Sequence, residues 1–157
     1  HNLRFYDDNE LTDILVQAAN KLENVNINRD ALHTIASRSR GTPRIALRLL
    51  RRVRDYADVR CDGNFDDEVV NAALTLEGID EVGMDALDRT YMETIAQTYE
   101  GGPVGVEAVA ASMGEDAGTL QDVVEPYLLQ VGFLARTRIG RQITPKGLEW
   151  LKNSITY

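Results

Sequence analysis

Cysteine and histidine are scarce in this sequence, and their scarcity excludes several kinds of site. The single cysteine, Cys61, rules out a disulfide within the chain and fits a reducing compartment. The two histidines are His1 and His33, so no Cys/His cluster with the spacing of a zinc site is present. We expect His33 to be a surface or structural residue of a helix, and we predict no metal ligand in the chain.

Long apolar runs and catalytic motifs are also missing. No stretch approaches the ~20 apolar residues of a membrane-spanning helix and no signal peptide is visible, so we expect a cytoplasmic protein without a membrane partner. The phosphate-binding loop pattern Gly-x4-Gly-Lys-Ser/Thr does not occur. No Ser/His/Asp set stands out from the acidic background. We therefore predict no catalytic residue within these 157 residues.

Negative charge predominates overall, yet it is distributed unevenly along the chain. The formal net charge is −8, but residues 38–60 hold eight arginines and only two aspartates. Residues 61–132 hold sixteen acids and one arginine, and residues 133–157 hold five cations and one glutamate. Two local basic segments on an acidic body therefore say more about binding partners than the overall charge does.

The first basic segment is predicted to form a helix over residues 43–59. Thr42 is a candidate N-cap, and Pro43 stands at the first helical position, where proline is favoured. The apolar face of this helix comprises Ala46, Leu49, Leu50, Val53 and Ala57, and the opposite face comprises Arg44, Arg48, Arg51 and Arg52.

Arg44 is the informative cation, because it lies in the first turn of this helix. The helix dipole is positive there, so a cation costs about 0.3–1 kcal/mol. A bound anion would turn that cost into a gain, since free backbone N–H groups and a guanidinium would converge on one phosphate. A solvated basic helix with an incidental first-turn arginine explains the local pattern equally well, and the pattern alone leaves both interpretations open.

Residues 1–80 are predicted to form a small domain of four helices. Apolar residues recur with helical spacing over residues 8–22, 29–38, 43–59 and 67–76. Asp7 or Asp8 can cap the first of these helices and Asp66 the fourth. The fourth helix is expected to bury Val69, Val70, Ala73 and Leu76. Residues 78–84 then read as a linker.

Residues 81–157 are predicted to form a winged-helix domain, a variant of the helix-turn-helix. The expected order is a helix over 85–99, a turn with an edge strand of two to three residues within 101–105, and helices over 106–113 and 115–131. Pro126 must kink or split the last of these. A hairpin of residues 133–137 and 141–144 follows, with Gly140 at its tip, and a final helix begins near Pro145. The chain as a whole is predicted to be mainly α.

The predicted wing is the second basic feature. Arg136, Arg138 and Arg141 supply charge-assisted hydrogen-bond donors for phosphates, and the glycine at the tip would allow close backbone approach. A solvated hairpin edge, protected by its charges against aggregation, is the alternative interpretation. The three arginines are expected to be exposed and to contribute little to the core.

The third helix of the winged-helix domain is acidic, which argues against base reading. It carries Glu115, Asp116, Gln121, Asp122 and Glu125. A negatively charged helix is repelled from the major groove, so this domain is expected to contact the DNA backbone through its wing.

Several blocks of sequence together resemble one known family. They are Phe5-Tyr6, Arg40-Gly41-Thr42-Pro43-Arg44-Ile45-Ala46, residues 49–55, residues 101–105, residues 114–119, Glu125-Pro126-Tyr127-Leu128 and residues 132–137. In order and spacing the chain is similar to the C-terminal part of the RuvB family of Holliday junction branch-migration motors. The resemblance covers essentially all 157 residues.

The resemblance implies a fold and a set of binding residues. Residues 1–80 would be the helical lid of an AAA+ ATPase, and residues 81–157 its winged-helix domain. Arg44 would be the sensor-2 arginine that contacts nucleotide phosphates, and Tyr6 a nucleotide-contacting residue. Arg136 and Arg141 would contact DNA, and Arg138 lies between them. Ala117-Gly118 stands where relatives can carry an arginine, so a phosphate contact is expected to be missing there.

The resemblance also implies partners of the intact protein. These are Mg-ATP as cofactor, the duplex arms of Holliday junctions, RuvA through an upstream domain, RuvC, and five further copies in a hexameric ring. Its activity would be that of an ATP-dependent DNA helicase in recombination and repair. Without the phosphate-binding loop, this part of the protein is expected neither to hydrolyse ATP nor to bind it tightly.

Two other interpretations belong to different functional classes. One is a winged-helix transcription regulator with a helical effector domain, against which the acidic third helix counts, because operator recognition needs base contacts. The other is an interaction module whose arginine helix binds an acidic protein.

Overall fold

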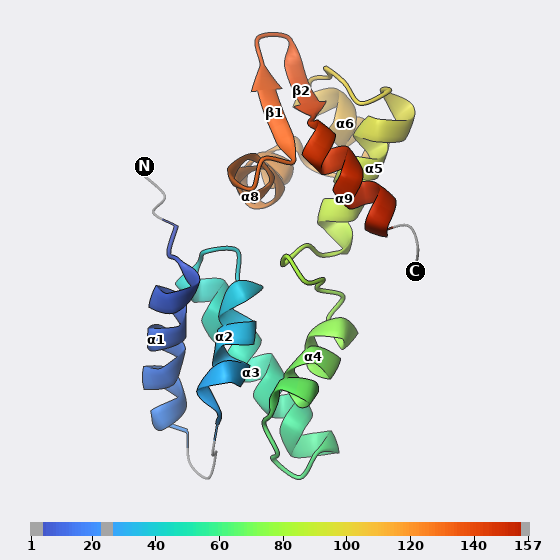
Figure 1. The fold of residues 1–157 in the computed structure, drawn as a ribbon. Coiled ribbons are helices and arrows are strands. Elements are labelled where there is room, and N and C mark those ends of the chain that lie inside the picture. Colours follow the sequence, from blue (N-terminus) through green and yellow to red (C-terminus); the bar gives the residue numbers. More distant parts are fainter. Residues whose placement is uncertain (1–4, 23–26, 155–157) are drawn as a thin grey trace. The chain divides into compact units, whose positions relative to one another are not determined.

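The computed structural model describes residues 5–22 and 27–154 of a mainly helical chain. The chain divides into two compact units, residues 1–85 and residues 86–157. Figure 1 labels most of the helices and the hairpin of strands β1 and β2 in the described residues. Each unit is built around its own buried apolar side chains, as expected for a small domain.

The described residues of the first unit form four helices. They are α1 (Asp8–Asn20), α2 (Arg29–Ser37), α3 (Pro43–Arg60) and α4 (Asp67–Leu76). Local caps fix the starts of α1 and α4: the Asp7 carboxylate accepts from the Glu10 N–H (2.7 Å), and the Asp66 carboxylate accepts from the Val69 N–H (2.9 Å). Glu10 completes a capping box by accepting from the Asp7 N–H.

The core of the first unit follows the predicted helical periodicity. Leu11 and Leu15 from α1, Leu32 and Ile35 from α2, and Val53 from α3 are essentially inaccessible to solvent. The whole predicted apolar face of α3 is buried, which confirms that part of the prediction. Burial of these side chains, rather than helix propensity alone, holds such short helices together.

Two details of this unit differ from the prediction. Leu76 was expected to face inward but is 62% exposed, and Leu74 is buried in its place. Leu76 is the last residue of α4 and lies to one side of the buried stripe, where the chain is already turning away. The first helix also ends at Asn20, so Leu22 packs against the core from the following turn.

The second unit has the predicted winged-helix order. Its elements are α5 (Ala86–Thr98), α6 (Val106–Met113), α7 (Ala117–Thr119), the π-helical turn η1 (Leu120–Val124), α8 (Glu125–Gln130), β1 (Leu134–Thr137), β2 (Gly140–Ile143) and α9 (Pro145–Ser154). Val104 forms a single antiparallel bridge to Arg141, which is the expected short edge strand. Figure 1 shows the hairpin beside α8 and α9.

The core of the second unit shows some different inward positions from those predicted. The helical spacing predicts that Leu87, Tyr91 and Ile95 of α5 face inward. Tyr91 and Ile95 are buried, while Leu87 is only partly buried and Met92 is fully buried. The helical stripe of α5 is thus rotated slightly from the predicted one. Trp150 of α9 stacks on Phe133, with ring centroids 5.4 Å apart. This pair closes the end of the hairpin against the last helix.

Pro126 splits the third helix, as predicted. Proline cannot continue a regular helix without a clash between its ring and the carbonyl of the residue four positions earlier, here Asp122. The turn before Pro126 is π-helical, and the Glu125 N–H donates to the carbonyl of Leu120. The wider turn accommodates the proline and fixes the direction of α8, which begins at Glu125.

Candidate functional site

The start of α3 brings together the two residues expected to contact nucleotide. The Tyr6 N–H donates to the carbonyl of Gly41 (2.8 Å), in the turn that leads into α3. That turn has left-handed backbone at Arg40 (φ 58°) and Gly41 (φ 72°). A Cβ on Gly41 would lie 3.1 Å from Phe5, so glycine lets the Phe5-Tyr6 segment lie against the turn. Tyr6 and Arg44 are therefore brought to the same end of one helix.

The first turn of α3 is not capped by a side chain, which corrects the role given to Thr42. Thr42 occupies the N-cap position, but its hydroxyl donates to the carbonyl of Ser39 (3.0 Å) and accepts no helix N–H. The first turn carries no acid, and Arg44 is exposed there. The helix start thus keeps backbone donors and a guanidinium available to an anion.

The rest of the arginine face of α3 is solvent-exposed. Arg48, Arg51 and Arg52 are exposed, and Arg52 makes a long ion pair with Glu77 (3.7 Å). Within the described part of the chain, no ion pair to an acid is formed by Arg44, Arg48 or Arg51. An exposed ion pair such as that of Arg52 with Glu77 contributes little to stability, so the arginine face of α3 is available for binding.

The wing is a hairpin whose two-residue turn is Arg138-Ile139. In the strand register Arg136 lies opposite Arg141, and Thr137 lies opposite Gly140. Arg138 is exposed and Ile139 is 76% exposed. Arg136 and Arg138 are thus both exposed cations of the wing, and Arg138, whose role was the least defined from the sequence, lies in the turn itself.

Gly140 does not lie at the tip, and its role differs from the predicted one. It is buried, begins β2 and has φ 145°. A Cβ on Gly140 would lie 2.5 Å from the carbonyl oxygen of Val104. Glycine is needed here because the edge segment at Val104 packs directly on the strand, not to admit a phosphate.

A buried carboxylate that the sequence did not predict lies beneath the wing. Glu125 was assigned to the acidic exposed face of the third helix, but its side chain is 0% exposed. Arg141 donates to it from Nε (2.9 Å) and from Nη2 (3.3 Å), and Arg136 donates from Nη2 (3.3 Å). The Tyr91 hydroxyl donates to Glu125 Oε2 (2.5 Å). Arg141 is only 15% exposed, whereas Arg136 is 54% exposed.

These contacts change the interpretation of the three wing arginines. Arg141 was expected to be exposed, yet most of its guanidinium is held in a buried ion pair. Arg136 makes one longer contact and remains half exposed. A signal for the buried carboxylate was present in the sequence, because Glu125 lies three residues before Leu128 and directly before the proline that redirects the helix.

Burial raises the pKa of Tyr91 well above its ordinary value of 10.0, and the hydrogen bond to Glu125 raises it further. The folded state therefore favours the neutral phenol. The contribution of the neutral Tyr91 phenol to the free energy of unfolding is fully present below pH 10. It is lost as the pH rises above 10, because the unfolded chain then releases a proton that the folded chain keeps.

We accordingly predict that the second unit loses stability above pH 10. The expected slope from Tyr91 is about 1.4 kcal/mol per pH unit. Trp150, the one tryptophan, reports unfolding of this unit in urea by its fluorescence. Tyr91→Phe should show a shallower loss than the wild type over the same pH range. Parallel stability curves for the two proteins would contradict the prediction.

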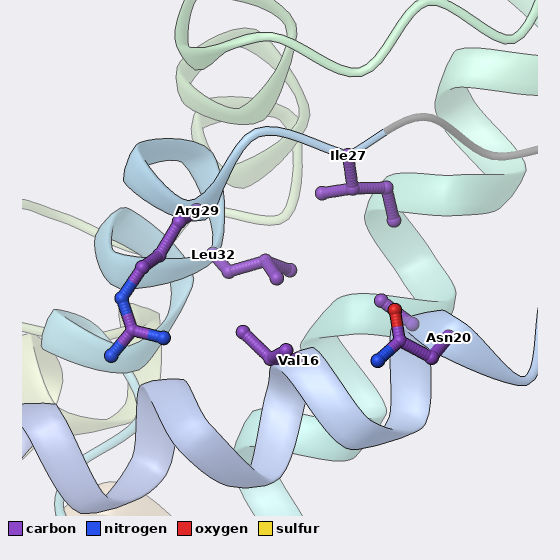
Figure 2. A pocket seen from close by; sticks show the side chains of 6 residues that line it. Val16, Asn20, Ile27, Arg29 and Leu32 are labelled. Carbon is purple, nitrogen blue, oxygen red and sulfur yellow. The ribbon is translucent and has the colours of Figure 1, made fainter.

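A pocket of about 180 Å³ lies between α1 and α2 (Figure 2). It is lined mainly by apolar side chains, including Val16 and Leu32. Its one cation, Arg29, donates to Asp13 (2.9 Å). The lining offers no convergent set of donors for a phosphate, so this pocket is not the nucleotide site.

Neither a metal centre nor a membrane span is found in the described residues. No group of three or more His, Cys, Asp or Glu side chains there is arranged to hold a metal ion. None of the helices in residues 5–22 and 27–154 is long and apolar enough to cross a membrane.

Comparison with known proteins identifies close relatives over both units. The family described as "RuvB AAA lid domain" matches residues 6–80, and the family described as "RuvB C-terminal winged helix domain" matches residues 81–152. The Holliday junction branch migration complex subunit RuvB 2 of Synechococcus sp. (strain JA-3-3Ab) is 51% identical over 149 residues, which cover 95% of this chain and 40% of the relative.

Two further proteins give the same result. The Holliday junction branch migration complex subunit RuvB of Fusobacterium nucleatum is 45% identical over 152 residues, covering 97% of this chain and 46% of the relative. The solved structure of the Thermotoga maritima RuvB Holliday junction branch migration motor superposes with a TM-score of 0.89 at 48% identity, covering 96% of this chain and 50% of that one. The chain thus spans less than half the length of these curated relatives. Nothing in the comparisons supports a transcription regulator.

Proposed function

The chain belongs to the RuvB family, and we propose that it is the lid and winged-helix part of an ATP-driven motor for Holliday junction branch migration. The observation that carries the proposal is the match of both family descriptions, one after the other, over residues 6–152. We assign residues 1–80 to the lid and residues 81–157 to the winged-helix domain. In the longer protein this part would serve an ATP-dependent DNA helicase in recombination and repair.

Nucleotide sensing is assigned to the start of α3. Arg44 and Tyr6 would contact Mg-ATP held mainly by an upstream domain. The proposal is supported by the uncapped first turn and by the position of Tyr6 beside it. A single charge-assisted hydrogen bond supplies roughly 1.5–3 kcal/mol, which corresponds to very weak binding by this part alone. Arg44 would therefore read the nucleotide state rather than provide the affinity.

DNA contact is assigned to the wing. Arg138 at the turn and the half-exposed Arg136 would bind backbone phosphates, and Arg141 would contribute the smaller part of its guanidinium that is exposed. The exposed acids of the third helix, Glu115, Asp116 and Asp122, disfavour insertion into the major groove. Positions 117 and 118 of that helix are alanine and glycine, so they supply no cation for a phosphate contact. The contact would therefore be weak and independent of base sequence.

The proposed assembly is a hexameric ring around the duplex arms of a junction. Each wing adds a few phosphate contacts, and six tethered copies raise the effective concentration enough for firm binding. The relatives are named as subunits of a branch migration complex, which supports a multi-subunit machine. RuvA and RuvC are the proposed protein partners, the former through an upstream domain, and the cytoplasm is the proposed location.

A change at the wing turn tests the DNA assignment. Arg138→Ala should weaken duplex binding to a similar extent for unrelated sequences, because it removes a phosphate contact and no base contact. The slope of log affinity against log salt should become shallower by about one unit. The measurement is fluorescence anisotropy of two labelled duplexes of unrelated sequence over a range of salt.

The matched control is Arg60→Ala, which removes the same charge from an exposed position in the first unit. It should leave both the affinity and the salt slope close to those of the wild type. If the two variants behave alike, net charge alone governs binding and the wing is not the DNA contact.

A further inference from the structure

The two innermost wing arginines face a structural conflict that one buried residue resolves. Arg136 and Arg141 lie directly opposite each other on paired strands. Like charges in this position repel and destabilise a hairpin. Glu125 lies beneath both and accepts hydrogen bonds from each guanidinium. It belongs to α8, so it ties the wing to the helical body of its domain.

We propose that Glu125 is a positioning residue for DNA binding: its hydrogen bond to Arg136, beside the fixed Arg141, holds Arg136 in an orientation that leaves the outer guanidinium donors ready for a phosphate. The inference rests on the proposed DNA contact of the wing. It assigns Glu125 no direct contact with DNA, because its side chain is 0% exposed.

The contact distances divide the roles of the two arginines. Arg141 approaches Glu125 with two donors and is only 15% exposed, so its guanidinium forms the fixed part of the cluster. Arg136 reaches Glu125 with Nη2 alone, at 3.3 Å, and 54% of its side chain is exposed. Arginine carries five donors, so most of those on Arg136 remain for a phosphate. Ordering this side chain before DNA arrives lowers the entropic cost of binding.

Tyr91 completes the support of the carboxylate. Its hydroxyl donates to Glu125 Oε2, the oxygen that also accepts from Arg141 Nε. Tyr91 is itself fully buried in α5. The high pKa of its phenol, caused first by burial, keeps the donor proton in place. The orientation of Glu125 is thus fixed from the core side as well as from the wing side.

A purely electrostatic role for Glu125 makes the opposite prediction. If the carboxylate only neutralised the wing, removing its charge would strengthen attraction to phosphates and raise the affinity. If it positions Arg136, removing its charge frees the arginines and lowers the affinity despite the gain in net positive charge. The sign of the change therefore separates the two roles.

The test compares Glu125→Gln and Tyr91→Phe in the full 157-residue chain, with binding to a labelled duplex measured at low salt. We expect Glu125→Gln to bind about tenfold more weakly and Tyr91→Phe about threefold more weakly, because DNA must then order the guanidinium groups itself. Tyr91→Phe changes no charge, so it carries the test alone if Glu125→Gln does not fold. Tighter binding by Glu125→Gln, or unchanged binding by a folded Tyr91→Phe, would overturn the inference.

Two controls separate this outcome from other causes of weak binding. Val109→Ala removes buried apolar volume from α6 of the same domain, at a residue with no part in the cluster. Val109→Ala should lower the midpoint of thermal unfolding, followed by Trp150 fluorescence, and leave the DNA affinity unchanged. A loss of affinity similar to that of Glu125→Gln would mean that general destabilisation, not positioning, weakens binding. Arg138→Ala tests the wing itself. If this variant binds DNA like the wild type, the proposed DNA contact of the wing fails. If Arg138→Ala weakens binding as expected but Tyr91→Phe binds like the wild type, only the positioning role of Glu125 is refuted.

Discussion

Replacing Arg44 by alanine is expected to reduce ATP-driven branch migration by about a hundredfold or more in a full-length protein that carries this chain. The loss should come from the failure to link the nucleotide state to the position of the lid, because Arg44 is the one cation in the first turn of α3. ATP hydrolysis and migration of a labelled four-way junction are the two measurements.

The same change should not destabilise the fold. Arg44 is exposed and lies outside the buried face of α3. A cation at a helix start opposes the helix dipole by about 0.3–1 kcal/mol, so the alanine variant should be equally stable or slightly more stable than the wild type. Lower activity together with undiminished stability is the signature of a residue retained for binding rather than for folding.

Arg48→Ala is the matched control. Arg48 is exposed on the same helix, one turn further along, so the variant loses the same charge from the same face. It should keep nearly all of the migration activity. Equal effects of the two substitutions would assign the function to the general charge of α3, and a wild-type rate for Arg44→Ala would remove the sensor assignment.

The features of the fold that depend on residues close together in the sequence could be predicted. Asp7 and Asp66 cap their helices as expected, because a capping side chain bonds to an amide only three residues away. The apolar face of α3 could be read from its helical spacing. The split at Pro126 follows from the geometry of proline itself. These features need no knowledge of distant parts of the chain.

The details that depend on contacts between distant residues could not be predicted. Thr42 is a local exception: it has the residue type of a cap, but its hydroxyl donates to the carbonyl of Ser39, three residues earlier. The hairpin pattern predicts Gly140 at the tip, whereas glycine is required at this position by the close approach of Val104, which is far away in sequence. Glu125 looked like one acid among many. Its burial depends on Tyr91 and on both strands of the hairpin, which lie in other elements.

The buried cluster leads to the largest effect on stability that we expect. Arg141→Ala should destabilise the second unit by about 3–5 kcal/mol, since it leaves the Glu125 carboxylate buried without its main partner. This differs from what the sequence suggested, namely that the wing arginines could be removed without harm to the fold. Urea unfolding followed by Trp150 fluorescence measures the change.

The other wing arginines provide graded comparisons. Arg136→Ala removes one longer contact from a half-exposed side chain and should cost no more than about 1 kcal/mol, as exposed ion pairs do. Arg138→Ala removes no contact to Glu125 and should leave the stability within about 0.5 kcal/mol of the wild type. The expected order of destabilisation is therefore Arg141, then Arg136, then Arg138.

A double variant separates the loss of the ion pair from the loss of arginine packing. In Arg141→Ala/Glu125→Gln the carboxylate charge is gone, so no uncompensated charge remains buried, and the double variant should be less destabilised than the sum of the two single variants. Strict additivity would mean that Arg141 stabilises the wing through its alkyl chain and not through Glu125. In that case the orientation of Arg136 would not depend on the ion pair between Arg141 and Glu125. The DNA affinity of Arg141→Ala, measured without urea at a temperature well below its unfolding midpoint, would then report only on the phosphate contact of Arg141.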